Sequence, residues 1–258
     1  MKKKKLFIAL ICMVIIGFLV VVYLLLFRKV EVSEPRLISD LCSKRLDEDH
    51  RMIYVKENGT YCGYYVIETS NYGDTVLLMR QYVYPRQMMY RDENMFGTGG
   101  AYYVDSIVDN FLENEFYSFF SDGMKSIIQN TPIRIHSIDY VSKYFDEGSV
   151  FEVINRHVFV LSAPEYGHGS LGLDKDEAAY IPELLQYGSK KENWLRSGAI
   201  GGDDTWVTIV YNDAASHRHI CNDAYVRPVF TVDPSGEIEL REIYEGLPIK
   251  RYVLVKDK

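Results

Sequence analysis

The hydrophobic pattern of the chain begins with one long apolar run. Residues 6–27 carry no charged side chain, and a helix of that length is about 33 Å long. This run exceeds the apolar segment of a secretory signal, so we expect an uncleaved transmembrane helix with the lipid bilayer as its partner. Lysines 2–5 precede the run and only Arg28 and Lys29 follow it, which places the N-terminus in the cytoplasm.

This run predicts a single-pass protein of the cell membrane whose C-terminal part lies outside the cytoplasm. We expect a lysine cluster and anchor over 1–29, a juxtamembrane stalk over 30–50, and an extracytoplasmic domain over 51–258. Within that domain a central unit covers 63–232, and residues 233–258 form a C-terminal β extension.

After residue 50 the apolar positions fall into short segments rich in aromatic and β-branched residues, which predict strands. Asn58-Gly59 separates the first two segments, and this pair tolerates the positive φ of a tight hairpin turn. Together with Thr60 it also matches a glycosylation acceptor. We therefore expect an antiparallel meander at the start of the domain. The predicted strands are Met52–Lys56, Tyr61–Glu68, Thr75–Tyr84, Ile133–Ile138, His157–Leu161, Trp206–Tyr211, His217–Cys221 and Tyr225–Val232.

Helical spacing is found mainly between residues 107 and 120, where Asp105 or Ser106 can cap the first turn. Ser121-Asp122-Gly123 ends this helix. Further short helices are predicted around 124–128 and over 174–185. Because strands and helices are segregated along the chain, the pattern favours an α+β fold with a mostly antiparallel sheet behind the transmembrane helix.

Charge and cysteine content narrow the classes of partner. The formal net charge is −7 and the sequence pI is about 5.4, which excludes a nucleic-acid partner that needs a basic surface. Outside the apolar run the cysteines are Cys42, Cys62 and Cys221, so at most one disulfide can close and the pairing stays open.

Two short motifs carry a resemblance to a known family. Trp194-Leu195-Arg196-Ser197 and Val226-Arg227-Pro228-Val229-Phe230 resemble the W-L-R-S and V-R-P-A-[FL] signatures of an uncharacterised bacterial domain family. The resemblance extends over about residues 63–232. Gly198 and Val229 depart from the family pattern, where Pro and Ala are usual.

That family is similar to the C-type-lectin-like and formylglycine-generating-enzyme (sulfatase-modifying factor) fold. The resemblance implies a mixed, lectin-like domain with irregular loops near its C-terminal strands. It does not bring oxidase activity with it, because those enzymes use a closely spaced cysteine pair and Cys221 stands alone.

The signature residues allow two interpretations. A guanidinium presents five donors in a rigid fork, so Arg196 and Arg227 can tie loop carbonyls or a carboxylate to the sheet, or they can clamp an anionic ligand. Trp194 can pack in the core or stack on a sugar. The candidate ligand-binding residues are Trp194, Arg196, Trp206 and Arg227, and the structural signature comprises Trp194, Leu195, Arg196, Ser197, Val226, Arg227 and Pro228.

One constellation could hold a metal. His217, His219 and Cys221 alternate along a predicted strand, so their side chains would share one face. Calcium is a second possibility, because several loop residues carry side-chain oxygens. These residues are Asp203, Asp204, Asn212, Asp213, Asn222 and Asp223.

Signatures of common enzymes are missing, including the G-x-S-x-G elbow, a phosphate-binding glycine loop and the H-E-x-x-H helix. We therefore expect a noncatalytic, membrane-anchored recognition module without a cofactor. Its partner would be a cell-envelope glycan or a protein. The alternatives are a metal-dependent enzyme using His217, His219 and Cys221, and a structural subunit of a membrane complex.

Overall fold

The computed structural model divides the chain into residues 1–34 and 35–258, and nearly all of the described residues belong to the second unit. The structure describes residues 34–42, 51–92, 99–138, 141, 150–167, 180–182, 184, 190–198, 206–211, 214–244 and 249–256.

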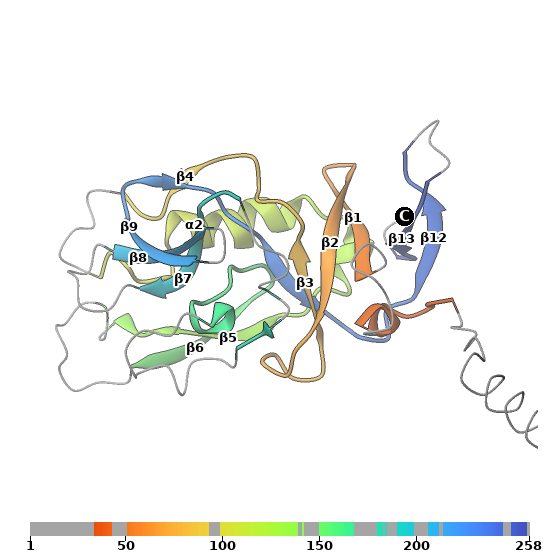
Figure 1. The fold of residues 1–258 in the computed structure, drawn as a ribbon, viewed down its shortest axis with the longest axis horizontal. Coiled ribbons are helices and arrows are strands. Elements are labelled where there is room, and N and C mark those ends of the chain that lie inside the picture. The colour runs from red at the N-terminus through yellow and green to blue at the C-terminus, as the bar shows by residue number, and fades with distance from the viewer. Residues whose placement is uncertain are drawn as a thin grey trace, which may run out of the picture. The chain divides into compact units, whose positions relative to one another are not determined.

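A six-stranded sheet dominates the described residues (Figure 1). Its strand order is β11-β3-β2-β1-β13-β12, and every neighbouring pair is antiparallel except β1 with β13. The C-terminal strands therefore extend the sheet beside its first strand. The strands are β1 (Met52–Glu57), β2 (Thr60–Glu68), β3 (Val76–Arg80), β11 (Val229–Val232), β12 (Ile238–Glu242) and β13 (Lys250–Leu254).

The predicted meander at the start of the domain is confirmed. Asn58 and Gly59 have φ angles of 48° and 80°, and they close a hairpin in which Glu57 pairs with Thr60. These are the positive values that an Asn-Gly turn supplies at low cost. β2 then pairs with β3, which ends at Arg80, earlier than the pattern predicted.

The other strands of the described residues form three smaller sheets. One is three-stranded with the order β7-β8-β9, and the others pair β5 with β6 and β4 with β10. Their bounds are β4 (Met88–Met89), β5 (Thr131–His136), β6 (Phe151–Arg156), β7 (Asn193–Gly198), β8 (Trp206–Tyr211), β9 (Ala214–His219) and β10 (Asp223–Ala224).

Helical structure in the described residues is short. α2 (Ile107–Asn110) continues into the π-helical η4 (Phe111–Phe116), and α3 (Asp122–Lys125) follows. The hydroxyl of Ser106 accepts from the backbone N–H of Asp109 and caps the first turn, as the sequence predicted. Two further helical turns are the 3₁₀ segments η1 (Ile38–Cys42) and η5 (Pro164–Tyr166).

The predicted α+β class is therefore wrong, because the fold is rich in sheet. The helix that begins at Ile107 ends within a few turns. Most other buried apolar residues lie in strands or in their connections. Most of the helix predicted over 174–185 lies outside the described residues.

The predicted transmembrane helix and single-pass membrane location are also corrected. Among the residues that the structure describes, no helix has the length and apolar character needed to cross a bilayer. The apolar run 6–27 itself lies outside those residues.

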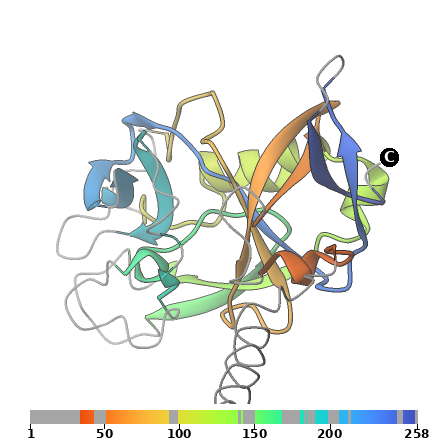
Figure 2. The ribbon, with the colours of Figure 1, turned by 45° about the vertical axis from the view of Figure 1, so that its right-hand side comes forward.

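Aromatic rings join the helical segment to the large sheet. Phe120 contacts both Phe116 and Phe230 of β11, with ring centroids 5.5 Å and 5.2 Å apart, and Phe230 contacts Tyr64 of β2 at 5.1 Å. In both views the helical segment passes behind strands of this sheet (Figures 1 and 2). These edge-to-face contacts bury one face of the sheet.

Candidate functional site

A groove of about 440 Å³ lies where β1, β2, the end of β3 and β13 meet. Aromatic and polar side chains dominate its lining. The lining residues are Met52, Tyr54, Tyr61, Cys62, Gly63, Arg80, Gln81, Tyr82, Tyr244 and Arg251.

The strand register brings part of this lining to one face of the sheet. Tyr54 lies opposite Gly63 and Lys56 lies opposite Tyr61 in the β1–β2 hairpin. Because side chains alternate along a strand, the intervening Val55 points the other way and is fully buried. The hairpin therefore turns Tyr54 and Tyr61 to one side of the sheet, whereas Cys62, which pairs with Val55, extends to the other side although it also lines the groove.

Gly63 leaves room for two neighbouring side chains. A Cβ atom at this position would lie 2.7 Å from Cε of Met52 and 2.8 Å from Oε1 of Gln81. Both distances are below van der Waals contact, so any larger residue would have to displace the ends of these two side chains.

Two tyrosines form the exposed rim of the groove. Tyr82 is 71% exposed and Tyr244 is 43% exposed. Each offers an apolar ring face and a hydroxyl that donates and accepts hydrogen bonds. Such side chains can contact a ligand with little loss of rotamer freedom, because they have only two side-chain torsions.

Arg80 is a fixed part of the groove wall. Its Nε and Nη2 donate to the two carboxylate oxygens of Glu57 at 2.8 Å and 3.1 Å, and its Nη1 donates to the carbonyl oxygens of Tyr82 and Val83. Burial lowers the pKa of Arg80, but hydrogen bonds and charge from Glu57 outweigh burial and raise it overall. The donors of this guanidinium are therefore used in contacts within the protein that stabilise the groove wall.

The thiol of Cys62 has a raised pKa, because burial and the nearby carboxylate of Glu57 both disfavour the thiolate. Nucleophilic cysteines need the opposite shift. Cys62 therefore contributes surface to the groove and is poorly suited to covalent chemistry.

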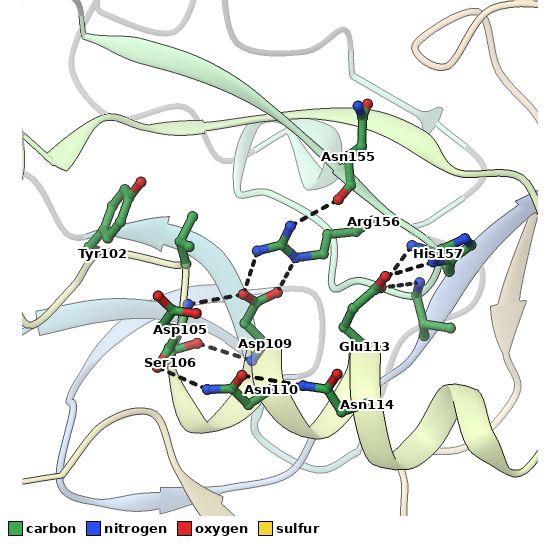
Figure 3. A network of polar contacts seen from close by, with 12 residues as sticks. Tyr102, Asp105, Ser106, Asp109, Asn110, Glu113, Asn114, Asn155, Arg156 and His157 are labelled. Atoms are coloured by element: carbon green, nitrogen blue, oxygen red, sulfur yellow. Dashed lines mark hydrogen bonds and ion pairs between the residues drawn. The ribbon is translucent and has the colours of Figure 1, made fainter.

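A second polar cluster joins the helical segment to the end of β6 (Figure 3). Arg156 donates from Nε and Nη2 to the two oxygens of Asp109 at 2.7 Å and 2.8 Å, and the backbone N–H of Asp105 donates to Asp109 at 3.1 Å. This bidentate pair fixes the first helical turn against β6.

Glu113 lies one turn further along the same helical face. Its carboxylate accepts from the backbone N–H of His157 at 2.8 Å and lies 2.6 Å from the ring atom Nδ1. The imidazole also stacks on Tyr117 with centroids 4.5 Å apart. The carboxylate accepts a bond from the backbone N–H of Val158 as well, at 3.4 Å, so the arrangement fastens a strand end to the helix. The sequence analysis missed this cluster, although the four-residue spacing of Asp109 and Glu113 places them on one helical face.

The signature tryptophan lies in the core and away from the groove. Trp194 is fully buried, its Nε1 donates to the carbonyl oxygen of Met88 at 2.8 Å, and its ring contacts Tyr90 at 5.4 Å. Trp206 begins β8 and pairs through its backbone with His219, and its side chain lies outside the described residues.

Arg196 is fully buried and connects three segments. Its Nε donates to the carbonyl oxygen of Arg134, and its Nη1 donates to the carbonyl oxygen of Val160 and to Oε2 of Glu165, each at 2.8 Å. Glu165 also accepts from the backbone N–H and the hydroxyl of Ser162, at 2.7 Å and 3.0 Å. A ligand could reach this guanidinium only if the core opened.

Arg227 is also buried, and it supports the edge of the groove. Its Nε and Nη2 donate to the carbonyl oxygens of Arg80 and Gln81 at 2.9 Å and 3.0 Å. Both acceptors belong to residues that line the groove. Other signature residues are packed in the same way: Leu195, Ser197 and Val226 are buried, and the carbonyl oxygen of Pro228 accepts from the backbone N–H of Arg80.

The candidate metal residues lie at the end of β9. His217 and His219 are separated by one residue on the strand, and Cys221 lies in the turn after it, where its N–H donates to Nδ1 of His219 at 3.4 Å. Within the described part of the chain, no group of three or more His, Cys, Asp or Glu side chains is close enough to hold a metal ion. Cys62 is a free thiol.

The candidate calcium residues are only partly placed. Asp203, Asp204, Asn212 and Asp213 lie outside the described residues. Asp223 begins β10, and its carbonyl oxygen accepts from Arg218 at 2.7 Å.

Comparison with known proteins identifies one family. No curated protein and no solved structure matches the chain. The family model described as a domain of unknown function, DUF6273, matches residues 73–234, which include Arg80, Gln81 and Tyr82 but not the other lining residues of the groove. Because this match covers more than half of the 258 residues, the chain belongs to the DUF6273 family.

Proposed function

We propose that this protein is a noncatalytic recognition module that binds a saccharide in the tyrosine-lined groove. The observation that carries the proposal is the convergence of Tyr54, Tyr61, Tyr82 and Tyr244 on one open groove. Tyrosine rings pack against the apolar C–H faces of sugar rings, and tyrosine hydroxyls exchange hydrogen bonds with sugar hydroxyls.

The position of the groove within the sheet favours a saccharide over an extended peptide. β3, β2, β1 and β13 each have a hydrogen-bonded neighbour on both sides. A peptide that adds as a strand needs an unpaired sheet edge, and these strands offer none. A ligand in the groove is therefore recognised by side chains, which suits a ring bearing several hydroxyl groups.

The lining favours binding over catalysis. The described lining residues include no histidine and no carboxylate, the groups that general acid–base chemistry most often uses. Cys62 has a raised pKa and Arg80 is committed to Glu57. The lectin-like resemblance of the signature motifs is in keeping with a saccharide ligand.

The test is binding of the purified chain to a panel of immobilised, structurally defined oligosaccharides, followed by calorimetry with any sugar that binds. We expect Tyr82→Ala and Tyr244→Ala each to weaken binding about tenfold, because each removes one aromatic contact. Tyr211→Ala is the matched control, since Tyr211 is 44% exposed at the end of β8 and is not part of the groove lining.

Two outcomes would contradict the proposal. One is that no oligosaccharide binds to the folded chain. The other is that Tyr211→Ala weakens binding as much as the groove variants do. Capture of a protein ligand by the same groove, in place of a sugar, would replace the saccharide with a protein partner.

A further inference from the structure

The groove combines its tyrosines with Arg251, whose guanidinium makes few hydrogen bonds to the described residues. The only described hydrogen bond from the Arg251 guanidinium runs from Nη1 to the carbonyl oxygen of the adjacent Lys250, at 3.4 Å. Within the described residues no carboxylate forms an ion pair with Arg251. Its guanidinium lies 5.9 Å from the ring centroid of Tyr54, close enough for a cation–π contact.

The two arginines that line the groove therefore differ in role. Arg80 uses Nε, Nη1 and Nη2 on Glu57, on two carbonyl oxygens and on the sulfur of Cys62. Arg251, by contrast, has a described partner for only one of its five donors. A planar guanidinium with free donors is suited to a carboxylate, which it binds through two parallel hydrogen bonds.

The charges around the groove point to the same ligand. The chain has a formal net charge of −7, yet none of the groove-lining residues that the structure describes is acidic. Lys56 adds a second cation beside the lining, 5.1 Å from the ring centroid of Tyr61. Because Glu57 neutralises Arg80, Arg251 is the lining cation that has no counter-ion among the described residues.

From this arrangement we propose that the groove selects an acidic saccharide, a sugar that bears a carboxylate, and that Arg251 recognises the carboxylate. The inference rests on the proposed saccharide-binding function and adds the charge of the ligand. Tyr54 orients the guanidinium through the cation–π contact, and the rim tyrosines contact the sugar rings. One guanidinium can bind one carboxylate, so one acidic sugar residue of the ligand would contact Arg251.

The register of the sheet sets how the arginine reaches the groove. Tyr54 pairs with Val253 across the parallel β1–β13 ladder, and Arg251 lies two residues before Val253 on β13. Residues two apart on a strand share a face, so Arg251 and Tyr54 extend from the same side of the sheet. Neither residue lies within the segment matched by the family model, so this specificity belongs to the flanking strands of this chain.

The experiment compares an oligosaccharide of galacturonic acid with its methyl ester, which has the same rings and hydroxyls but no charge. Calorimetry with the full folded chain should give about tenfold tighter binding of the acid than of the ester, the increment of one charge-assisted hydrogen-bonded pair. Added salt should weaken binding of the acid and leave binding of the ester nearly unchanged.

Variants assign the preference to one side chain. Arg251→Met should bind acid and ester equally, whereas Arg241→Met should keep the preference. Arg241 is the cross-strand neighbour of Arg251, but it is paired with Glu239 and does not line the groove. Thermal unfolding of both variants checks that each is folded.

The outcomes separate this inference from the function on which it rests. Equal binding of acid and ester by the unmodified chain would overturn the acidic-ligand inference and leave the saccharide function standing. A preference that survives Arg251→Met would also overturn it. Binding of neither compound, together with no binding across the wider oligosaccharide panel, would overturn both proposals.

Discussion

The guanidinium of Arg196 and the carboxylate of Glu165 form an ion pair of 2.8 Å in which neither side chain is more than 1% exposed. Tyr72 also donates its hydroxyl to Glu165. Burial raises the pKa of Tyr72 well above its ordinary value, so the phenol stays protonated and remains a donor. The pair connects β7 to the turn η5. It therefore affects the stability of the folded protein.

Breaking this buried pair should be costly. Arg196→Met leaves Glu165 as an uncompensated charge in the core, and we expect a loss of about 3–5 kcal/mol in the free energy of unfolding, measured by urea denaturation. The double variant with Glu165→Gln should be more stable than Arg196→Met alone, since the stranded charge is gone.

The control for this prediction is a pair on the surface. Arg86 and Glu115 lie 2.9 Å apart with both side chains 48% exposed, so Arg86→Met should cost less than about 1 kcal/mol. Equal losses from Arg86→Met and Arg196→Met would show that burial does not determine the strength of the Arg196 pair.

Arg227 is expected to act through the groove wall and not through a ligand. Arg227→Ala leaves the carbonyl oxygens of Arg80 and Gln81 without their donor, so the free energy of unfolding should fall by about 1–3 kcal/mol. Arg227→Lys keeps the positive charge but not the planar set of guanidinium donors. It should therefore recover only part of the lost free energy of unfolding. A variant with full stability in urea but no saccharide binding would instead assign Arg227 to the ligand.

His136 should make the stability of the protein depend on pH. Burial, with a smaller contribution from the charge of Arg196, lowers the pKa of His136 from 6.5 to about 4. The folded state thus holds the imidazole neutral, while the unfolded chain binds a proton below its ordinary pKa. Stability is therefore complete above that ordinary pKa and falls by about 1.4 kcal/mol for each pH unit between about 6.5 and about 4.

The measurement is urea denaturation at about pH 7 and about pH 5. His136→Gln should reduce the difference between the two conditions, whereas His217→Gln, at an exposed position on β9, should leave it unchanged. An unaltered difference in His136→Gln would assign the pH dependence to other groups.

Local features of the fold were predictable because their causes lie within a few residues. Asn58-Gly59 predicts its own hairpin through the backbone preferences of two residues. Ser106 predicts the start of the helix because its hydroxyl reaches an N–H only three residues away. The overall class was not predictable in this way. A helical period near residue 110 does not reveal how short the helices are or how far the sheet extends.

The groove depends on contacts between residues far apart in the chain. Tyr54 and Gly63 belong to the first hairpin, whereas Arg251 arrives on β13. Trp194, Arg196 and Arg227 were predicted to be candidate ligand-binding residues because of their side-chain chemistry and their place in the signature motifs. In the structure all three side chains are buried and bond within the protein. Tyrosines form the exposed surface of the groove instead.

The turns, the caps and the alternation of side chains along strands such as β1 could be predicted from the sequence alone. These depend on backbone torsions and side-chain periodicity, which are set over a few consecutive residues. The parallel pairing of β13 with β1, which places Arg251 on the same face as Tyr54, is a property of the tertiary structure. Strand order is chosen by the burial of the whole sheet, and no local stretch of sequence contains that information.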